Sequence, residues 1–285
     1  GVVNIALEGI MLMGAYVGAV VIKKLEVTGA NTFVLLLVSL MFGLFIGYVL
    51  YTLIQYLFRK TSIDFTQNNI KWPIYGVSAA IGVLVMYLLM ANSSQNIQVA
   101  MVGLLVGAIV GTAFSFFHAF ASINMKANQI ISATALNMFA PAFAIFINRT
   151  FSDTGTQKVT IQESYRITEV GFLADIPILG DLLFKGAYLS TFLGVAIFAV
   201  AVIILYKTKF GLRLRACGEN PQAADSLGIN IYKIRYSGVL VSGALAGMGG
   251  VIFVLSFASN FNATVSGFGF LALAVLIFGN WKPGR

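Results

Sequence analysis

Charged residues are scarce in this sequence. Only 10% of the 285 residues are Asp, Glu, Lys or Arg, whereas 59% are hydrophobic, and the mean hydropathy is +0.90. Because soluble domains carry about a quarter charged residues, this composition indicates an integral membrane protein. The net charge of +8 comes from basic residues clustered between apolar runs, which argues against nucleic acid as a partner.

The sequence has one cysteine, one histidine and no nucleotide-binding loop motif. Cys217 is the only cysteine, which excludes an internal disulfide and an all-cysteine metal site; we expect it to be a small buried side chain. His118 is the only histidine, and without a metal-ligand companion it is expected to pack or to form a local hydrogen bond. No Gly-x-x-x-x-Gly-Lys-Ser/Thr loop occurs, so the sequence offers no P-loop for ATP, and we predict no metal or cofactor in it.

Long apolar runs occupy most of the chain. A bilayer core takes about 20 helical residues, and seven runs approach or exceed that length: 5–22, 32–57, 72–91, 98–121, 129–148, 187–206 and 236–259. An eighth run, 266–279, is short, so we expect it to be tilted and extended or re-entrant. The predicted fold class is an all-α integral membrane protein. It is a multi-span helical bundle with about eight membrane segments in one transmembrane domain over residues 1–285, and we expect native residues to be missing at both ends.

Lysine and arginine indicate the orientation. With an inside start, four loops face the cytosol: 58–71, 122–128, 207–235 and 280–285. They hold twelve of the eighteen basic residues, as expected for cytosolic loops, although Lys23 and Lys24 lie on the other side. The polar segment 150–186 is then predicted to be an external loop.

Small residues at four-residue spacing recur within the runs. Gly103, Gly107 and Gly111 form one stripe, and Gly243 and Gly247 form another. Two further pairs repeat the pattern: Gly14/Gly18 and Gly43/Gly47. Such stripes let helix backbones approach closely in lipid. We predict helix packing at these positions, a signal that channels, transporters and membrane enzymes share.

Polar residues inside the apolar runs are candidates for function. Asn4 and Glu8 are four apart and are expected to share one helix face. Glu8 is the only acidic residue within a predicted span, so a proton relay of carboxylates is poorly supported. Two alternatives stay open for this pair: bonds to a neighbouring helix or loop, which we favour, and direct contact with a transported solute.

A second polar cluster precedes a proline. Its members are Asn128, Gln129, Ser132, Thr134 and Asn137, of which all but Thr134 are candidate path residues. Pro141 follows and removes a backbone hydrogen bond, so we expect the helix to kink or break there. Broken helices in membranes line cavities or are buried in protein. The cluster is therefore a candidate stretch of translocation path, with hydrogen bonds between helices as the equal alternative.

A short polar helix is predicted over 221–227, in the longest basic loop. Asn220 can cap it with its side-chain oxygen, and Pro221 suits the first helical position, where no amide donor is needed. Gly228 can adopt the left-handed conformation that ends a helix. A rigid helix on the cytosolic face of a membrane protein needs a soluble partner to explain it.

Three motifs carry a family resemblance. They are residues 1–16, residues 127–137, and residues 211–229 continued by 242–250; the closing residues 278–283 are similar too. The chain resembles the permease subunits of bacterial ABC importers for simple sugars and nucleosides, which are related to the branched-chain amino-acid permeases. Within that group it looks closest to the nucleoside permeases.

The resemblance implies roles for the short polar helix. Ala223-Ala-Asp-Ser-Leu-Gly228 is similar to the Ala-Ala-x-x-x-Gly element that importer permeases present to their ATPase subunits. The residues implied in coupling are Glu219, Asn220, Pro221, Ala223, Ala224 and Gly228, flanked by Arg213 and Arg215. The two small alanines would let the helix sit deep in a cleft of the ATPase.

The resemblance also implies partners and a mechanism. A pair of permeases, identical or homologous, would sit over two ATPase subunits that use ATP and Mg, with an extracellular or lipid-anchored binding protein delivering solute. The chain would be a multi-pass transport subunit of a bacterial plasma membrane and not an enzyme. It would move a nucleoside, or a simple sugar such as ribose, by alternating access. The alternative is an ion-gradient-driven secondary transporter, which predicts a coupling-ion site in the spans and transport without ATP.

Overall fold

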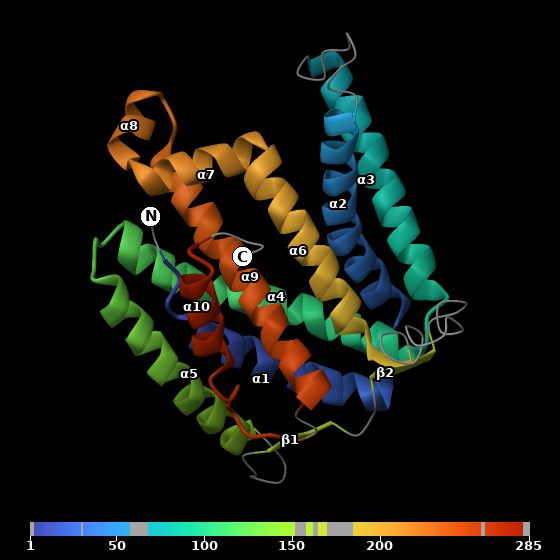
Figure 1. Cartoon of the computed structure of the whole chain (residues 1–285). Helices are drawn as coiled ribbons and strands as arrows, with labels where there is room; N and C mark the ends of the chain where they lie inside the picture. Colours follow the sequence, from blue (N-terminus) through green and yellow to red (C-terminus); the bar gives the residue numbers. More distant parts are fainter. Residues whose placement is uncertain are drawn as a thin grey trace.

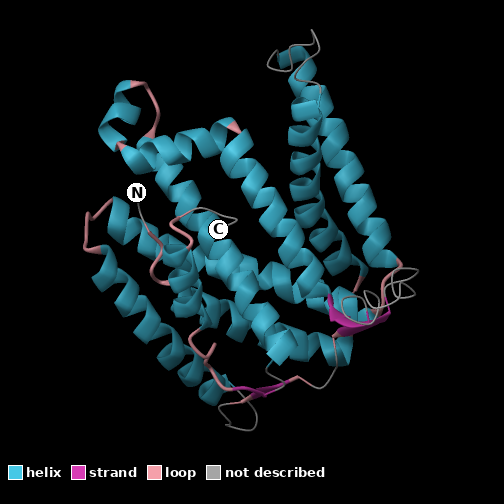
Figure 2. Ribbon diagram, viewed as in Figure 1, coloured by secondary structure: helices cyan, strands magenta, loops and turns pink. Residues whose placement is uncertain are grey.

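Helices form where the apolar runs lie. The computed structural model describes residues 3–29, 31–57, 68–151, 158–161, 165–169, 185–257 and 260–281. The long helices are α1 (Leu7–Thr28), α2 (Thr32–Leu57), α3 (Asn68–Ala91), α4 (Gln95–Ile123), α5 (Gln129–Phe151), α6 (Leu189–Lys207) and α9 (Ile231–Phe257). The shorter ones are α7 (Lys209–Glu219), α8 (Pro221–Ser226) and α10 (Phe268–Phe278). Figure 2 shows how far helices dominate the molecule.

Six helices in the described residues are long and apolar enough to cross a membrane: α2, α3, α4, α5, α6 and α9. The predicted multi-span helical class is therefore confirmed. Helix α1, predicted as a span over 5–22, is 22 residues long but carries Glu8 near its start and Lys23, Lys24 and Glu26 near its end. It is nevertheless central, because most of its residues from Gly9 to Ile22 are buried among other helices.

Helices α1, α4 and α9 pack at the centre through glycines (Figure 1). Gly107 and Gly111 of α4 lie against Gly243 and Gly247 of α9, so closely that a methyl group on Gly247 would overlap the carbonyl oxygen of Gly107. On the other side of Gly247, a methyl group on Gly14 of α1 would lie 2.5 Å from its Cα. Close approach of three backbones is possible because these positions lack side chains.

The apolar core surrounds these contacts. Gly103 of α4 faces the side chain of Ile22 on α1, and Val251 of α9 fills the space beside Gly18 and Gly107. Ile22 and Val251 are fully buried. Dispersion contacts of this kind hold membrane helices together, since lipid is as apolar as the side chains.

Helices α2 and α3 form a hairpin to one side of this centre (Figure 1). Gly43 and Gly47 of α2 lie against Val83 and Ala79 of α3, and a methyl group on Gly82 would overlap the Gly43 carbonyl oxygen. The glycine pair of α2 thus packs the hairpin itself. Helix α6 is packed much less: none of its apolar window is buried inside the protein.

Helix α5 is not broken at its proline. It runs without interruption from Gln129 to Phe151, so the break expected at Pro141 is wrong. A membrane helix tolerates a proline because neighbouring helices and local adjustments satisfy the freed backbone group. The interruption lies instead in the eighth run, where α10 has only 11 residues and follows the strand β4 (Asn260–Phe261). At 1.5 Å per residue α10 is about 16 Å long, roughly half of a bilayer core.

Short strands lie at the end of the molecule opposite α7 and α8 (Figure 1). They are β1 (Val159–Thr160), β2 (Arg166–Glu169), β3 (Lys185–Tyr188) and β4. Strand β1 pairs antiparallel with β4, and β2 pairs antiparallel with β3. The Tyr165 hydroxyl donates a hydrogen bond to Glu26 near the end of α1 at 2.9 Å. The described parts of the predicted external loop 150–186 thus lie at this end of the molecule in two separate two-stranded sheets, and its remaining residues fall outside the described ranges.

Parts of three predicted cytosolic loops meet at the other end. The Tyr236 hydroxyl, next to loop 207–235, donates to Asn124 of loop 122–128 at 2.6 Å. Trp281 of the closing loop lines a cavity with Ala127 and Asn128. In loop 58–71, residues 58–67 lie outside the described ranges, and α3 begins at Asn68. The membrane side that each of these segments faces stays a prediction.

Candidate functional site

The basic loop 207–235 folds into two short helices, α7 and α8, between α6 and α9 (Figure 1). The Asn220 side chain accepts a hydrogen bond from the Ala223 N–H at 3.1 Å, and Pro221 occupies the first helical position of α8. Gly228 has a φ of +76°, and its N–H donates to the Asp225 carbonyl. The predicted caps are confirmed, and they make α8 a defined turn even though it spans only six residues.

Helix α8 presents one alanine outward and one inward. Ala223 is exposed together with Gln222, Asp225 and Leu227, whereas Ala224 is only 3% exposed. Both alanines were expected to enter a cleft of a partner. The structure leaves Ala223 on the outer face, while Ala224 packs against this chain and cannot reach another protein without local rearrangement.

The other residues implied in coupling surround α8. Arg213, Arg215 and Glu219 are exposed on α7. The Arg215 guanidinium lies 5.2 Å from the ring centroid of Tyr206 at the end of α6, a cation–π arrangement. Cys217 is buried, as a small filler.

A tight elbow joins α6 to α7. The Thr208 hydroxyl donates to the Ile204 carbonyl at 2.6 Å and accepts from the Gly211 N–H at 3.2 Å. One side chain therefore closes the last turn of α6 and caps α7. Gly211 is buried against the carbonyl oxygens of Ile204 and Leu205, where any side chain would overlap them. The α6–α7–α8 segment is thus connected by caps rather than by a flexible linker.

The candidate path residues lie around the segment 3–9, which precedes and begins α1. The Val3 N–H donates to Gln129 Oε1 at 3.2 Å, and the Gly9 N–H donates to Asn137 Oδ1 at 2.8 Å. Asn137 also donates from Nδ2 to the Ile5 carbonyl at 3.3 Å. These bonds tie the start of α1 to α5.

His118 of α4 joins the same network and is fully buried. Its Nε2 lies 3.3 Å from the Val3 carbonyl, and its Nδ1 lies 3.2 Å from Ser132 Oγ. A carbonyl only accepts, so Nε2 carries the proton and, in a neutral ring, Nδ1 accepts from the Ser132 hydroxyl. The expectation of a local hydrogen bond for His118 is confirmed.

Asn4 and Glu8 do not share a helix face, contrary to expectation. Helix α1 begins at Leu7, so Asn4 lies before it, and Asn4 Nδ2 donates to Ser242 Oγ of α9 at 3.2 Å. Its Oδ1 is buried and finds no hydrogen-bond partner among the described residues. Glu8 turns to α10 instead: its Oε1 and Oε2 accept from the Gly267 and Gly269 N–H groups at 2.9 and 2.7 Å.

Glu8 therefore caps a half-length helix in the interior. Gly267 adopts a φ of +82° at the N-cap of α10, which has no capping side chain of its own. A carboxylate is favoured there because it satisfies two orphan N–H groups and meets the positive end of the helix dipole. Sequence reasoning missed Ser242, Gly267 and Gly269 as partners. The Gly-x-Gly pair directly before a short apolar run was the available signal.

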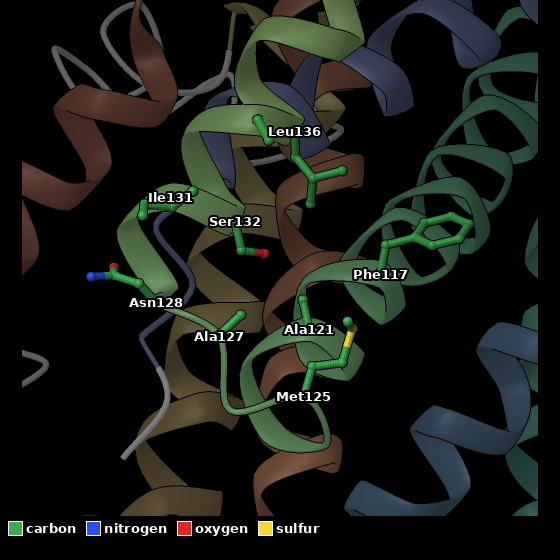
Figure 3. A pocket seen from close by; sticks show the side chains of 9 residues that line it. Phe117, Ala121, Met125, Ala127, Asn128, Ile131, Ser132 and Leu136 are labelled. Carbon is green, nitrogen blue, oxygen red and sulfur yellow. The ribbon is translucent and has the colours of Figure 1, made fainter.

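Two cavities flank this network. One of about 430 Å³ lies between the end of α4 and the start of α5; Figure 3 shows Phe117 and Met125 on one side and Ser132 and Leu136 on the other. The second, of about 650 Å³, has Gln129 on its wall, with α5 and the N-terminal segment on one side and α10 on the other. Asn128 lines both cavities, and its Oδ1 accepts from the Ile130 N–H at the start of α5.

Comparison with known proteins identifies the family. The family described as the branched-chain amino acid transport system permease component matches residues 73–284. The chain belongs to this family. Six helices of its described residues are long and apolar enough to cross a membrane, and the chain is a multi-pass permease component of the cell membrane.

Individual relatives are permeases too. The nucleoside ABC transporter permease protein NupC of Lactococcus lactis is 44% identical over 181 residues, which cover 63% of this chain and 56% of the relative. The guanosine ABC transporter permease protein NupQ of Bacillus subtilis is 42% identical over 182 residues, covering 63% and 56%. A second Lactococcus lactis protein, the nucleoside ABC transporter permease protein NupB, is 26% identical over 192 residues, covering 63% and 50%. The chain thus spans about half the length of these relatives. No solved structure matches it.

Proposed function

We propose that this permease is the membrane-spanning subunit of an ABC importer for nucleosides. Separate ATPase subunits would hydrolyse ATP with Mg, and an extracellular or lipid-anchored binding protein would deliver the solute. A second permease, identical or homologous, would complete the channel. Simple sugars such as ribose are the second candidate class of transported solute.

The observation that carries the proposal is the capped, exposed helix α8 at the predicted cytosolic end of a family permease. Its Asn220 and Gly228 caps hold six residues rigid, and Ala223 leaves the outer face free of bulk. A small rigid projection can fit a cleft on a partner and transmit force. Helix α8 lies outside the apolar spans, so insertion into the membrane does not account for it. A soluble partner would account for it.

Contacts of α7 offer a route for that force into the membrane. Leu214 of α7 packs close to Gly238 of α9, and the Thr208 elbow joins α7 to α6. Helix α9 is in turn packed glycine to glycine on α4 through Gly243 and Gly247. Movement of α8 would therefore shift α6 and α9 against α1 and α4, which is the alternating-access motion we propose.

The nucleoside assignment rests on relatives. Two of them are named nucleoside permeases and one a guanosine permease.

Co-purification of the full-length permease with its ATPase tests the coupling role. The variant Ala223→Glu places a charge on the exposed face of α8 and should abolish recovery of the ATPase while the permease keeps its thermal stability. The matched control Lys233→Glu changes an exposed charge on α9, just outside α8, and should keep the ATPase. An ATPase recovered equally with Ala223→Glu would contradict the coupling role.

Uptake into vesicles tests the rest. Nucleoside uptake should require ATP inside the vesicle and the binding protein outside. Uptake driven by an ion gradient without ATP would instead establish a secondary transporter.

A further inference from the structure

Aromatic side chains of α4, α5 and α9 form a continuous series, here called the aromatic ladder. Its members are Tyr236, Phe116, Phe117, Phe114, Phe139 and Phe143. Neighbouring ring centroids are 5.1 to 6.5 Å apart, within the range of aromatic pairs. Starting from Tyr236 near the start of α9, the series continues along α4 to Phe143, more than halfway along α5. It therefore reaches from the predicted cytosolic end into the membrane interior.

The ladder leaves ring surface open. Phe116 is 47% exposed, Phe117 60% and Phe139 50%. The glycine stripe of α4, by contrast, is packed against α1 and α9. One face of α4 thus packs against α1 and α9 through its glycines. Another face carries the exposed rings of Phe116 and Phe117.

The cavity of about 430 Å³ adjoins the ladder at Phe117 (Figure 3). Its volume falls within the range of small-molecule sites. Ser132 contributes a hydroxyl that donates to His118 and keeps its lone pairs for a further donor. None of its nine lining residues is charged. A phosphorylated solute would find no cation among these lining residues, whereas a neutral one meets the ring of Phe117 and a polar group.

We propose that this cavity and the aromatic ladder form a binding surface, leading from the predicted cytosolic end into the membrane, for the base of a neutral nucleoside. The inference rests on the proposed function and assigns the solute a position in it. The flat heteroaromatic ring stacks on open Phe faces, a contact that every base can make, and Ser132 accepts a hydrogen bond from a sugar hydroxyl. Stacking without a fixed hydrogen-bond pattern lets the solute slide from one ring to the next.

Photo-crosslinking of the complete transporter tests direct contact. With 8-azidoadenosine as the probe, we expect labelled peptides that contain Phe114–Phe117 or Phe139–Phe143. Excess guanosine should protect them, and ribose or adenosine monophosphate should not. Labelling elsewhere only would show that these rings face lipid or a second permease and would overturn the proposal, and equal protection by the nucleotide would overturn the preference for a neutral solute.

Uptake by variants tests the consequence. Replacing Phe116 and Phe117 together by Leu keeps apolar bulk but removes the rings, and should lower the guanosine uptake rate about tenfold. The pair Phe116→Tyr, Phe117→Tyr should restore it. The control Phe198→Leu removes an equally exposed ring from α6, away from the ladder, and should leave uptake within about twofold.

The two levels of failure are distinguishable. If the intact transporter takes up no nucleoside at all, the proposed function fails. If uptake is normal, the double Leu variant matches the wild type and the wild-type ladder is not labelled, only the ladder assignment fails.

Discussion

Glu8 Oε2 accepts a hydrogen bond from the Gly269 N–H at 2.7 Å, which joins the second residue of α1 to the start of α10. Together with the bond from Gly267 at 2.9 Å, it gives a half-length helix a cap that its own sequence lacks. An acidic residue in the membrane region is expensive unless it is paired. Here two backbone N–H groups and the dipole of α10 are the partners.

The first prediction concerns this cap. Glu8→Gln removes the charge and replaces one acceptor oxygen by a donor that faces an N–H, so it should cost about 1–3 kcal/mol of stability. Glu8→Ala should cost at least as much. Thermal unfolding in detergent measures both, with Glu219→Gln, an exposed change on α7, as the control expected to be neutral. Unchanged melting of both Glu8 variants would mean that the cap is dispensable.

The second prediction concerns Asn137 of α5, whose side chain caps the start of the neighbouring helix α1. Ala6, the N-cap of α1, has no side-chain acceptor, and the Asn137 amide from α5 accepts from Gly9 instead while donating to Ile5. Asn137→Ala leaves both backbone groups unpaired and should destabilise the protein by about 1–3 kcal/mol. Asn92→Ala loses only a bond within its own exposed helix end and should be nearly neutral in the same unfolding assay.

The third prediction concerns the glycine contacts of the centre. A methyl group on Gly247 overlaps the Gly107 carbonyl oxygen, and rigid backbone on both sides cannot move away. Gly247→Ala should therefore cost about 1–3 kcal/mol. Gly249, two residues away, would place its methyl 3.8 Å from Met11 Cε, an ordinary contact, so Gly249→Ala should be neutral or slightly stabilising. Equal melting temperatures for the two variants would refute this packing.

The fourth prediction concerns the α6–α7 elbow. Thr208→Val keeps the shape of the side chain but removes the cap of α7, which should cost about 0.5–2 kcal/mol locally. Hydrogen exchange should accelerate at amides 209–213. The control Thr150→Val loses only a hydroxyl bond to Phe146 in its own helix and should leave that exchange unchanged. Protection of 209–213 that survives in Thr208→Val would show that the elbow is held by other contacts.

Structural features that depend on only a few neighbouring residues could be predicted from the sequence. Asn220, Pro221 and Gly228 predicted the limits of α8 because a cap and a left-handed glycine depend only on neighbouring backbone. At Pro141, where a kink or a break was expected, the break was wrong. A missing backbone bond breaks a helix in isolation, but α5 stays continuous in the bundle.

Amino-acid sequence alone determined that this is a helical membrane protein, where its apolar helices run, and that a capped polar helix follows the sixth span, because hydropathy and capping are local properties. Only the tertiary structure decided which polar groups meet. Asn4 bonds to Ser242 and Glu8 to Gly267 and Gly269, partners more than 230 residues away. Periodicity places a side chain on a helix face, but the packing of the whole bundle determines what that face meets, and a buried polar group must find its partner there.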